Sequence, residues 1–273
     1  MKIIYVIMFF LLWFLQPYAQ SGLLTLLGDD GVSYEDETLA YQTRVETDGG
    51  EIMNITALNN AIIAAKSGDY IDSLALWVSP SFGVKKDANN KVTVLYDVTS
   101  NDNDLIQADT SKCATLIGDS LNFNAENRFY EFTDIATIRA TFWVLDDLSI
   151  GDTEIRFIMG DNSQYHFHRG ALETGKTRIY WDAGFIAAGV SGGTLRENNN
   201  IVDGTGVAIK SIKTIISLIT SANVEGGNFT QDRGNVNSAW NGRLWELVIS
   251  STPFSDTKRE LIETNLNTRH IVY

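Results

Sequence analysis

The pattern of hydrophobic and polar positions changes near residue 73. From there to the C-terminus, short apolar or alternating runs are separated by Gly, Asn, Asp and Ser. Successive residues of a strand point to opposite faces, so each run predicts a β-strand. Many strands without a regular alternation of helices predict an all-β sandwich or barrel. The expected strands are SLALWV, KVTVLY, LNFN, RATFWVL, EIRFIMG, QYHFHR, TRIYW, TIISLIT and RLWELVIS.

One of these segments also fits a helix. In SIKTIISLITS, the residues Ile212, Ile215, Ile216 and Ile219 recur at helical spacing. The segment is dense in β-branched side chains, which pack well on a pleated surface. We therefore interpret it as a strand.

A helix is expected on the N-terminal side of the strands, in NITALNNAIIAAKSG over residues 54–68. Leu58, Ile62 and Ala65 fall on one face, and Asn54 or Thr56 can cap the N-terminus. This amphipathic pattern predicts a helix that packs against the main domain.

A second helix is expected to close the chain, in TPFSDTKRELIETNL. Ser255 or Asp256 can cap it, and an acid in the first turn suits the positive end of the helix dipole. Leu261, Ile262 and Leu266 form its apolar stripe. A terminal helix after a strand would close one open end of the sandwich and tie down the C-terminus.

The first residues form a separate segment. Lys2 precedes an uncharged apolar run over residues 3–15 and then QPYAQSG. This arrangement predicts a secretory signal peptide over residues 1–19, cut after Ala19, with a retained hydrophobic anchor as the alternative. The expected organisation is then a connector and helical leader over 20–72 and a sandwich over 73–273, secreted or on the cell surface.

The charge of the chain narrows the class of partner. It has 273 residues with 34 acids against 21 bases, a formal charge of −13. A surface this negative repels phosphate backbones, so we expect no nucleic-acid partner. Cys113 is the single cysteine, which excludes an internal disulfide framework and predicts an inert buried thiol.

The C-terminal stretch WNGRLWELVISSTPFSDTKRELIETNL resembles the closing signature of LamG-like, concanavalin A-like lectin/glucanase domains. The resemblance extends to LALWVSPSFGV and LNFNAENRFYEF, which look like opening strands of that family. It implies a concanavalin A-like two-sheet jelly-roll sandwich with a short N-terminal helical leader and a small C-terminal helix. The matching positions are Gly242, Glu246, Ser255, Asp256, Arg259, Ile262 and Leu266.

The same resemblance implies a function in recognition. It points to non-catalytic binding of carbohydrate or another surface polymer by an extracellular or virion-associated domain. The segment AYQTRVETDGGEIMNITALNNAIIAAKSGDYIDSLALW is similar to a leader on such domains in phage proteins. The alternative is therefore a structural or receptor-binding subunit of a phage tail or head fibre, with homo-oligomeric or virion partners.

Glucanase chemistry requires a second carboxylate. Two acids at same-face positions of a strand can flank a glycosidic bond, one as nucleophile and one as acid. In RLWELVIS, Glu246 has Leu244 and Val248 at the neighbouring same-face positions, and no expected strand presents a carboxylate pair. We expect Glu246 to be structural, bonding the backbone or an arginine near the terminal helix, and a glycoside hydrolase is the less favoured reading.

The loop DVTSNDND over residues 97–104 is the candidate metal site. Asp97, Asn101, Asp102 and Asp104 concentrate hard oxygen ligands of the kind that suit calcium. The spacing lacks the glycine and distal glutamate of an EF-hand. The alternative is an ion-free turn, because Asn and Asp side chains also cap their own backbone.

Two tryptophans are candidates for stacking on a sugar ring. Trp181 is followed by Asp182, and Trp240 lies beside Asn237 and Asn241. An exposed aromatic ring flanked by amide and carboxylate groups offers both apolar contact and hydrogen bonds to a pyranose. These residues predict a sugar-binding rim.

Two histidines complete the candidate site. In YHFHR, His166 and His168 share one strand face, a spacing that also occurs in zinc sites. We expect the two imidazoles to line a ligand groove. The alternative is a solvent-facing polar pair, with Tyr165 and Phe167 directed into the core.

Overall fold

The computed structural model describes residues 33–124, 127–148, 156–161, 167–169, 187–204, 211–231, 233–234 and 239–273. Its named strands join into a 14-stranded sheet, and their pairings are antiparallel. The prediction of a β-dominated fold is therefore confirmed. The strands are β1 (Glu51–Ile52), β2 (Leu74–Val78), β3 (Gly83–Lys86), β4 (Val92–Leu95), β5 (Leu105–Ile106), β6 (Thr115–Ile117), β7 (Ser120–Asn122), β8 (Tyr130–Asp147), β9 (Arg156–Gly160), β10 (Phe167–Arg169), β11 (Thr194–Glu197), β12 (Asn200–Ile201), β13 (Thr214–Phe229) and β14 (Gly242–Ser250).

Eight of the nine expected strands correspond to described elements, and TRIYW lies outside the described residues. The ambiguous isoleucine-rich segment is the first half of β13, as its β-branched content predicted. The helices are α2 (Asp36–Thr47), α3 (Ile55–Ser67), the 3-10 turn η1 (Ile71–Ser73), α4 (Ala188–Ser191) and α5 (Asp256–His270).

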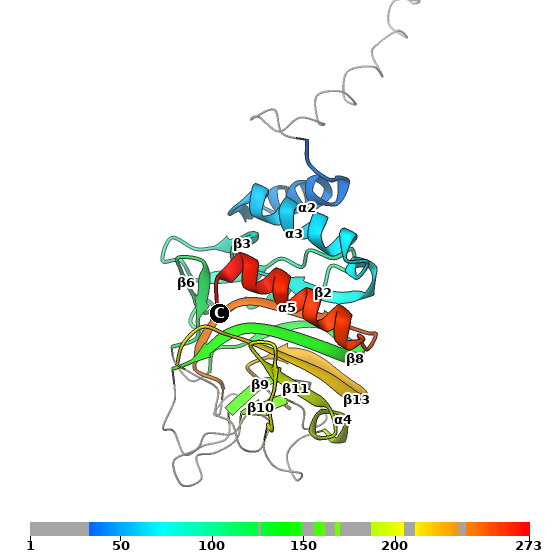
Figure 1. Ribbon diagram of the computed structural model, residues 1–273. Helices are drawn as coiled ribbons and strands as arrows, with labels where there is room; N and C mark the ends of the chain where they lie inside the picture. The colour runs from blue at the N-terminus through cyan, green and yellow to red at the C-terminus, as the bar shows by residue number, and fades with distance from the viewer. Residues whose placement is uncertain are drawn as a thin grey trace, which may run out of the picture.

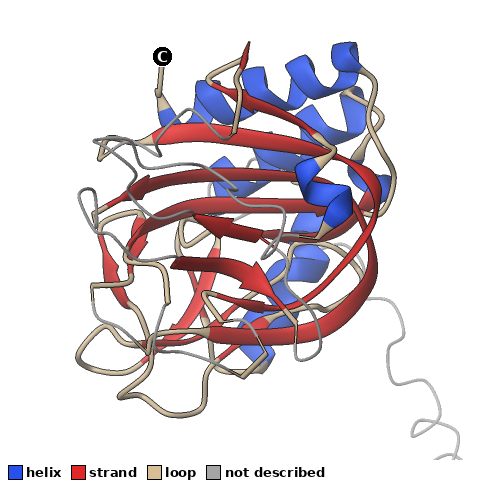
Figure 2. Cartoon of the chain, turned by 90° about the horizontal axis from the view of Figure 1, so that it is seen from below, coloured by secondary structure: helices blue, strands red, loops and turns tan. Residues whose placement is uncertain are grey.

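Two long strands, β8 and β13, link two groups of strands. One group contains β14 and β2, and the other contains β5 and β9. The second half of β8 pairs with β14, and β14 pairs in turn with β2. The first half of β8 pairs with β5, while the second half of β13 pairs with β9. Register shifts along β13 between Ile219 and Asn228 mark bulges, which bend a strand. Figure 2 shows the long strands curving between the two groups.

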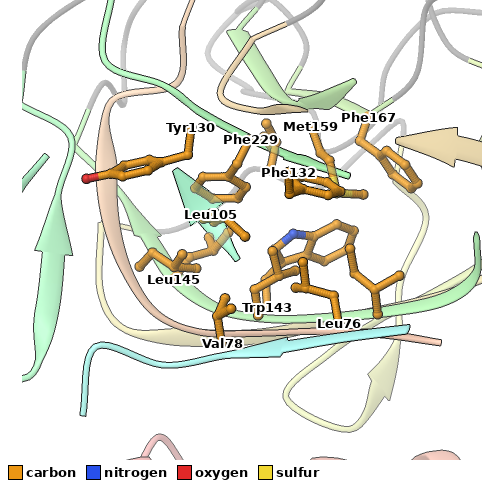
Figure 3. Packing of buried hydrophobic residues seen from close by; sticks show 14 of the residues in the cluster. Leu76, Val78, Leu105, Tyr130, Phe132, Trp143, Leu145, Met159, Phe167 and Phe229 are labelled. Carbon is orange, nitrogen blue, oxygen red and sulfur yellow. The ribbon is translucent and has the colours of Figure 1, made fainter. Parts of the chain in front are cut away.

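The main hydrophobic core lies between these two groups of strands. Trp143 and Leu145 enter it from the second half of β8, and Tyr130 and Phe132 enter it from the first half. Phe229, at the end of β13, packs among them (Figure 3). The bend therefore lets one strand supply residues to both sides of the same core.

A second core lies on the outer face of one group, beneath the helices. Side chains alternate along β8, so Phe142 and Val144 point away from the main core. They belong to a cluster with buried residues of α2, α3 and α5. Figure 1 shows these three helices on one side of the long strands. Burial on both faces explains why this stretch of β8 is apolar at consecutive positions.

The α3 helix follows its sequence pattern. The Asn54 side chain accepts a hydrogen bond from the Ala57 amide at 2.9 Å, which caps the helix. Leu58, Ile62 and Ala65 are buried in the second core, as predicted.

The α5 helix is capped by Ser255, whose hydroxyl accepts from the Lys258 amide at 3.3 Å. Ile262 and Leu266 are buried, but Leu261 is 39% exposed, so its place in the buried stripe was predicted wrongly. Leu261 instead lies at the helix rim beside Gly68, where a Cβ atom would come within 2.8 Å of its Cδ2.

The N-terminal region contains a helix that the sequence pattern did not predict. The α2 helix begins with acids in the stretch interpreted as a connector, and Tyr41 and Val45 anchor it in the second core. No helix among the described residues is long and apolar enough to cross a membrane. The expected signal peptide over residues 1–19 lies outside the described part of the chain.

Candidate ligand-binding cleft

A cleft of about 560 Å³ lies beside the loop that follows β4. Its apolar lining includes Ala75, Val98 and Ile135. Hydroxyl and amide side chains and three acids make up the polar part of the lining. The uncharged polar residues that line the cleft are Thr99, Ser100, Asn101, Asn103, Thr133 and Ser251.

A second hollow of about 490 Å³ adjoins the first along β8. Thr133 borders both hollows. The 97–104 loop also borders both hollows. Asn101 and Asn103 line the first hollow, and Asp102 and Asp104 line the second. The pairing of β5 with the start of β8 places the loop next to this strand.

Buried Asp97 organises the loop between the two hollows. Its carboxylate accepts hydrogen bonds from the amides of Trp77 at 2.8 Å, Thr99 at 3.0 Å and Asn103 at 3.0 Å. The Thr99 hydroxyl donates a fourth at 2.7 Å. Burial raises the pKa of Asp97 to about 6, while the donated hydrogen bonds oppose that rise. The Asp97 carboxylate therefore holds the turn together from inside the protein.

Arg44 of α2 neutralises the other acids of this loop. Its Nη1 donates to both oxygens of Asp104, at 2.9 and 2.8 Å, and its Nε lies 3.2 Å from an oxygen of Asp102. The second Nη donates to the backbone carbonyl of Asp97. The Arg44 guanidinium thus pairs with two carboxylates that were predicted to bind calcium.

The four predicted calcium ligands have other partners in the structure. The Asn101 amide donates to the backbone carbonyls of Leu74 and Ala75, at 3.0 and 3.3 Å. Within the described ranges, no group of three or more His, Cys, Asp or Glu residues is arranged to hold a metal ion. The alternative reading, a turn held by its own side chains, is the one the geometry matches.

Trp240 is a core residue and does not stand at a rim. Its indole is fully buried and packs against Phe123 and Phe229, at ring-centroid distances of 5.7 and 6.1 Å. Gly242 provides the space, because a Cβ atom there would come within 2.1 Å of the indole. The glycine two residues later thus lets the ring fold inward. The expectation of an exposed stacking surface at Trp240 is wrong.

His168 is also buried, together with its neighbour Phe167. Its ring packs against Phe157 at a centroid distance of 4.9 Å, and it lines neither of the two hollows. The expected alternation fails here because a register shift separates residues 167 and 168 in the pairing of β10 with β9. Asn241 is half-buried and is not among the residues that line either hollow. Outside the described residues lie His166, Trp181, Asp182 and Asn237.

Glu246 lies in a buried ionic cluster under α5. Its carboxylate accepts from Arg269 Nη2 at 2.6 Å and from the Trp77 indole at 2.7 Å, and His270 Nε2 lies at 2.7 Å. Burial acts to raise the pKa of Glu246, but Arg269 and His270 outweigh it and lower the pKa to about 2. The predicted bond from Glu246 to an arginine near the terminal helix is confirmed.

The residues of β8 that line the cleft were not predicted. Thr133 and Asp134 occupy adjacent exposed positions in YEFTDIAT, where the hydrophobic alternation is interrupted. Asp134 lies against Gly227 of β13, where a Cβ atom would come within 1.9 Å of its Oδ1. That interruption was the available sequence signal, and glycine is what makes room for the carboxylate.

Comparisons with known proteins identify no family for the chain. No family model and no curated protein matches it. Among solved structures, it is similar to Trypanosoma rangeli sialidase in complex with sialic acid, with 11% identity, a TM-score of 0.40 and coverage of 79% of this chain and 39% of that one. The ligand binding domain of botulinum neurotoxin serotype D, in complex with N-acetylneuraminic acid, shows 12% identity, a TM-score of 0.39 and coverage of 74% and 52%. The chain spans about half or less of these structures, and such similarities carry no conclusion about function.

Proposed function

We propose that this protein recognises a glycan or another surface polymer without catalysis, through the cleft beside the 97–104 loop. The observation that supports this is the lining itself. Ligand sites combine an apolar surface with a few placed polar groups. Here apolar residues share the lining with hydroxyl and amide side chains that suit the hydroxyl groups of a sugar.

The proposal includes a fold and a location. We propose a concanavalin A-like jelly roll, because two groups of antiparallel strands face each other across one core and share β8 and β13. A secreted, cell-surface or virion-associated protein fits the apolar N-terminal run. Catalysis by Glu246 is disfavoured, because an arginine and a histidine hold that carboxylate inside the protein.

Replacing Thr133 with tryptophan should weaken binding at least about tenfold, because the indole would fill space at the border of both hollows. The measurement is a glycan-array screen of the full chain, followed by titration of the best hit with both proteins. Thr137→Trp is the matched control, since Thr137 lies on the same strand and lines neither hollow.

Equal affinity of the Thr133 and Thr137 variants would show that the ligand binds elsewhere. A wild-type array without any hit would overturn glycan recognition altogether. The proposal would then pass to the structural or receptor-binding subunit of a phage fibre, for which stable oligomers in solution are the corresponding observation.

A further inference from the structure

We infer that the two hollows form one groove for an extended glycan chain that carries no acidic groups, with amino-bearing sugar units bound most tightly. This inference rests on the proposed function and specifies its ligand class. Three features carry it: the shared border of the two hollows at Thr133, the charge of their walls, and the placement of two acids on β8.

The hollows adjoin each other along the strand. Residues 133–135 of β8 line the first hollow and residues 131–133 line the second, so Thr133 is their common border. Each volume, about 560 and 490 Å³, is within the range of roughly 300–1,000 Å³ for a ligand site. A groove with two such compartments suits a chain of several sugar units better than a single one.

The walls carry one sign of charge. Six acids line the two hollows, and no Lys, Arg or His side chain of the described residues lines either one. Some of this negative charge is balanced by basic residues that do not line the hollows. Arg44 pairs with Asp102 and Asp104, and Lys66 lies 3.0 Å from Glu37.

The remaining acids are exposed. Asp72 and Asp134 line the first hollow, and Glu131 lines the second. Asp134 Oδ1 lies against Gly227 on the neighbouring strand. The backbone of Glu131 pairs with Ile106 of β5. Along β8, these two acids flank Thr133.

This arrangement discriminates by charge. Carboxylates accept hydrogen bonds from sugar hydroxyls and pair with the ammonium group of an amino sugar. The same groups repel the carboxylate of a uronic or sialic acid, and repulsion of a wrong ligand is an effective source of specificity. The groove thus selects neutral and amino-bearing chains against acidic ones.

The experiment is a titration of the full chain with hexasaccharides grouped by charge: chitosan hexamer, neutral cello-, malto-, manno- and N-acetylchitohexaose, and oligogalacturonate. We expect chitosan to bind at least about tenfold more tightly than oligogalacturonate, and raised salt to reduce that ratio. The matching disaccharide should bind at least about tenfold more weakly than its hexamer.

The double variant Glu131→Gln/Asp134→Asn should reduce the preference for chitosan over a neutral hexamer by about tenfold. Its affinity for the neutral hexamer should stay within about threefold of wild type. The control is Glu225→Gln/Glu260→Gln, which removes the same charge from exposed positions outside the groove. Circular dichroism and thermal unfolding of both variants establish that each is folded.

The outcomes separate this inference from the proposed function. Oligogalacturonate binding as tightly as neutral hexamers would overturn the charge selection and leave glycan recognition standing. Equal affinity for disaccharide and hexamer would overturn the extended groove. Binding of none of these hexamers would overturn the inference, while the glycan array decides independently whether glycan recognition itself fails.

Discussion

Replacing Glu246 with glutamine is expected to lower the free energy of unfolding by about 3 kcal/mol, because it leaves the buried side of Arg269 without its counter-ion. Glutamine keeps the shape of the side chain, so the loss reports the missing charge and not a cavity. The Trp77 indole and His270, both bonded to the same carboxylate, would also meet a weaker partner. The measurement is urea-induced unfolding at neutral pH, followed by tryptophan fluorescence.

The matched control is Glu260→Gln on α5, the helix that carries Arg269. The Glu260 side chain is 54% exposed and lies 3.4 Å from Arg196. Exposed ion pairs contribute only about 0–1 kcal/mol, so this variant should unfold close to wild type. Equal destabilisation by both substitutions would show that the buried cluster contributes no more to stability than an exposed ion pair.

The Glu246 carboxylate also makes the free energy of unfolding depend on pH. Its pKa in the folded protein is about 2, below the ordinary value of 4.5, so folding favours the charged form. The stabilisation is present above pH 4.5 and is lost as the pH falls toward 2, with a total of about 3 kcal/mol. Asp97 acts in the opposite direction, since its raised pKa makes the folded state lose stability as the pH rises from 3.8 to 6.

The difference between wild type and the Glu246→Gln variant isolates the acid-dependent part, because Asp97 is common to both proteins. The stability difference should shrink steadily from pH 5 to pH 2, which acid titrations of unfolding at fixed urea can measure. A difference that stays constant over this range would contradict the assignment of the low pKa to Glu246.

The sequence predicted most of the strands because burial on one or two faces leaves a readable pattern. β2 and β14 appear as apolar runs, and their pairing buries both. The terminal helix was predictable from its cap and stripe, since Ser255, Ile262 and Leu266 act within one local segment. The partner of Glu246 was also foreseeable, because a lone acid in a buried strand requires a cation.

The α2 helix was missed for a physical reason. Its acids and polar residues give it little local sign of amphipathicity, and its anchors Tyr41 and Val45 become meaningful only against the second core. Arg44 was missed with it. The guanidinium that neutralises Asp102 and Asp104 comes from this helix, so composition alone could not tell a calcium loop from an arginine-held one.

The cleft could not be predicted because its two walls are far apart in sequence. The 97–104 loop and the 131–135 part of β8 meet only through the pairing of β5 with β8. Strand pairing of this kind depends on the register of the whole sheet, which no single segment encodes. The error at Trp240 has the opposite origin, since an aromatic residue in a polar stretch looks exposed until its packing partners are known.

Trp240→Ala should therefore destabilise the protein by about 3–5 kcal/mol, the range for removing a buried Phe or Trp from a packed core. The loss of contacts with Phe123 and Phe229 leaves a cavity between the two groups of strands. Trp240→Phe, which retains an aromatic ring, should lose much less. Thermal unfolding of the three proteins gives the comparison, and glycan binding measured well below the transition should be unchanged in both variants. A stable Trp240→Ala protein with lost binding would instead restore the stacking role that the sequence first suggested.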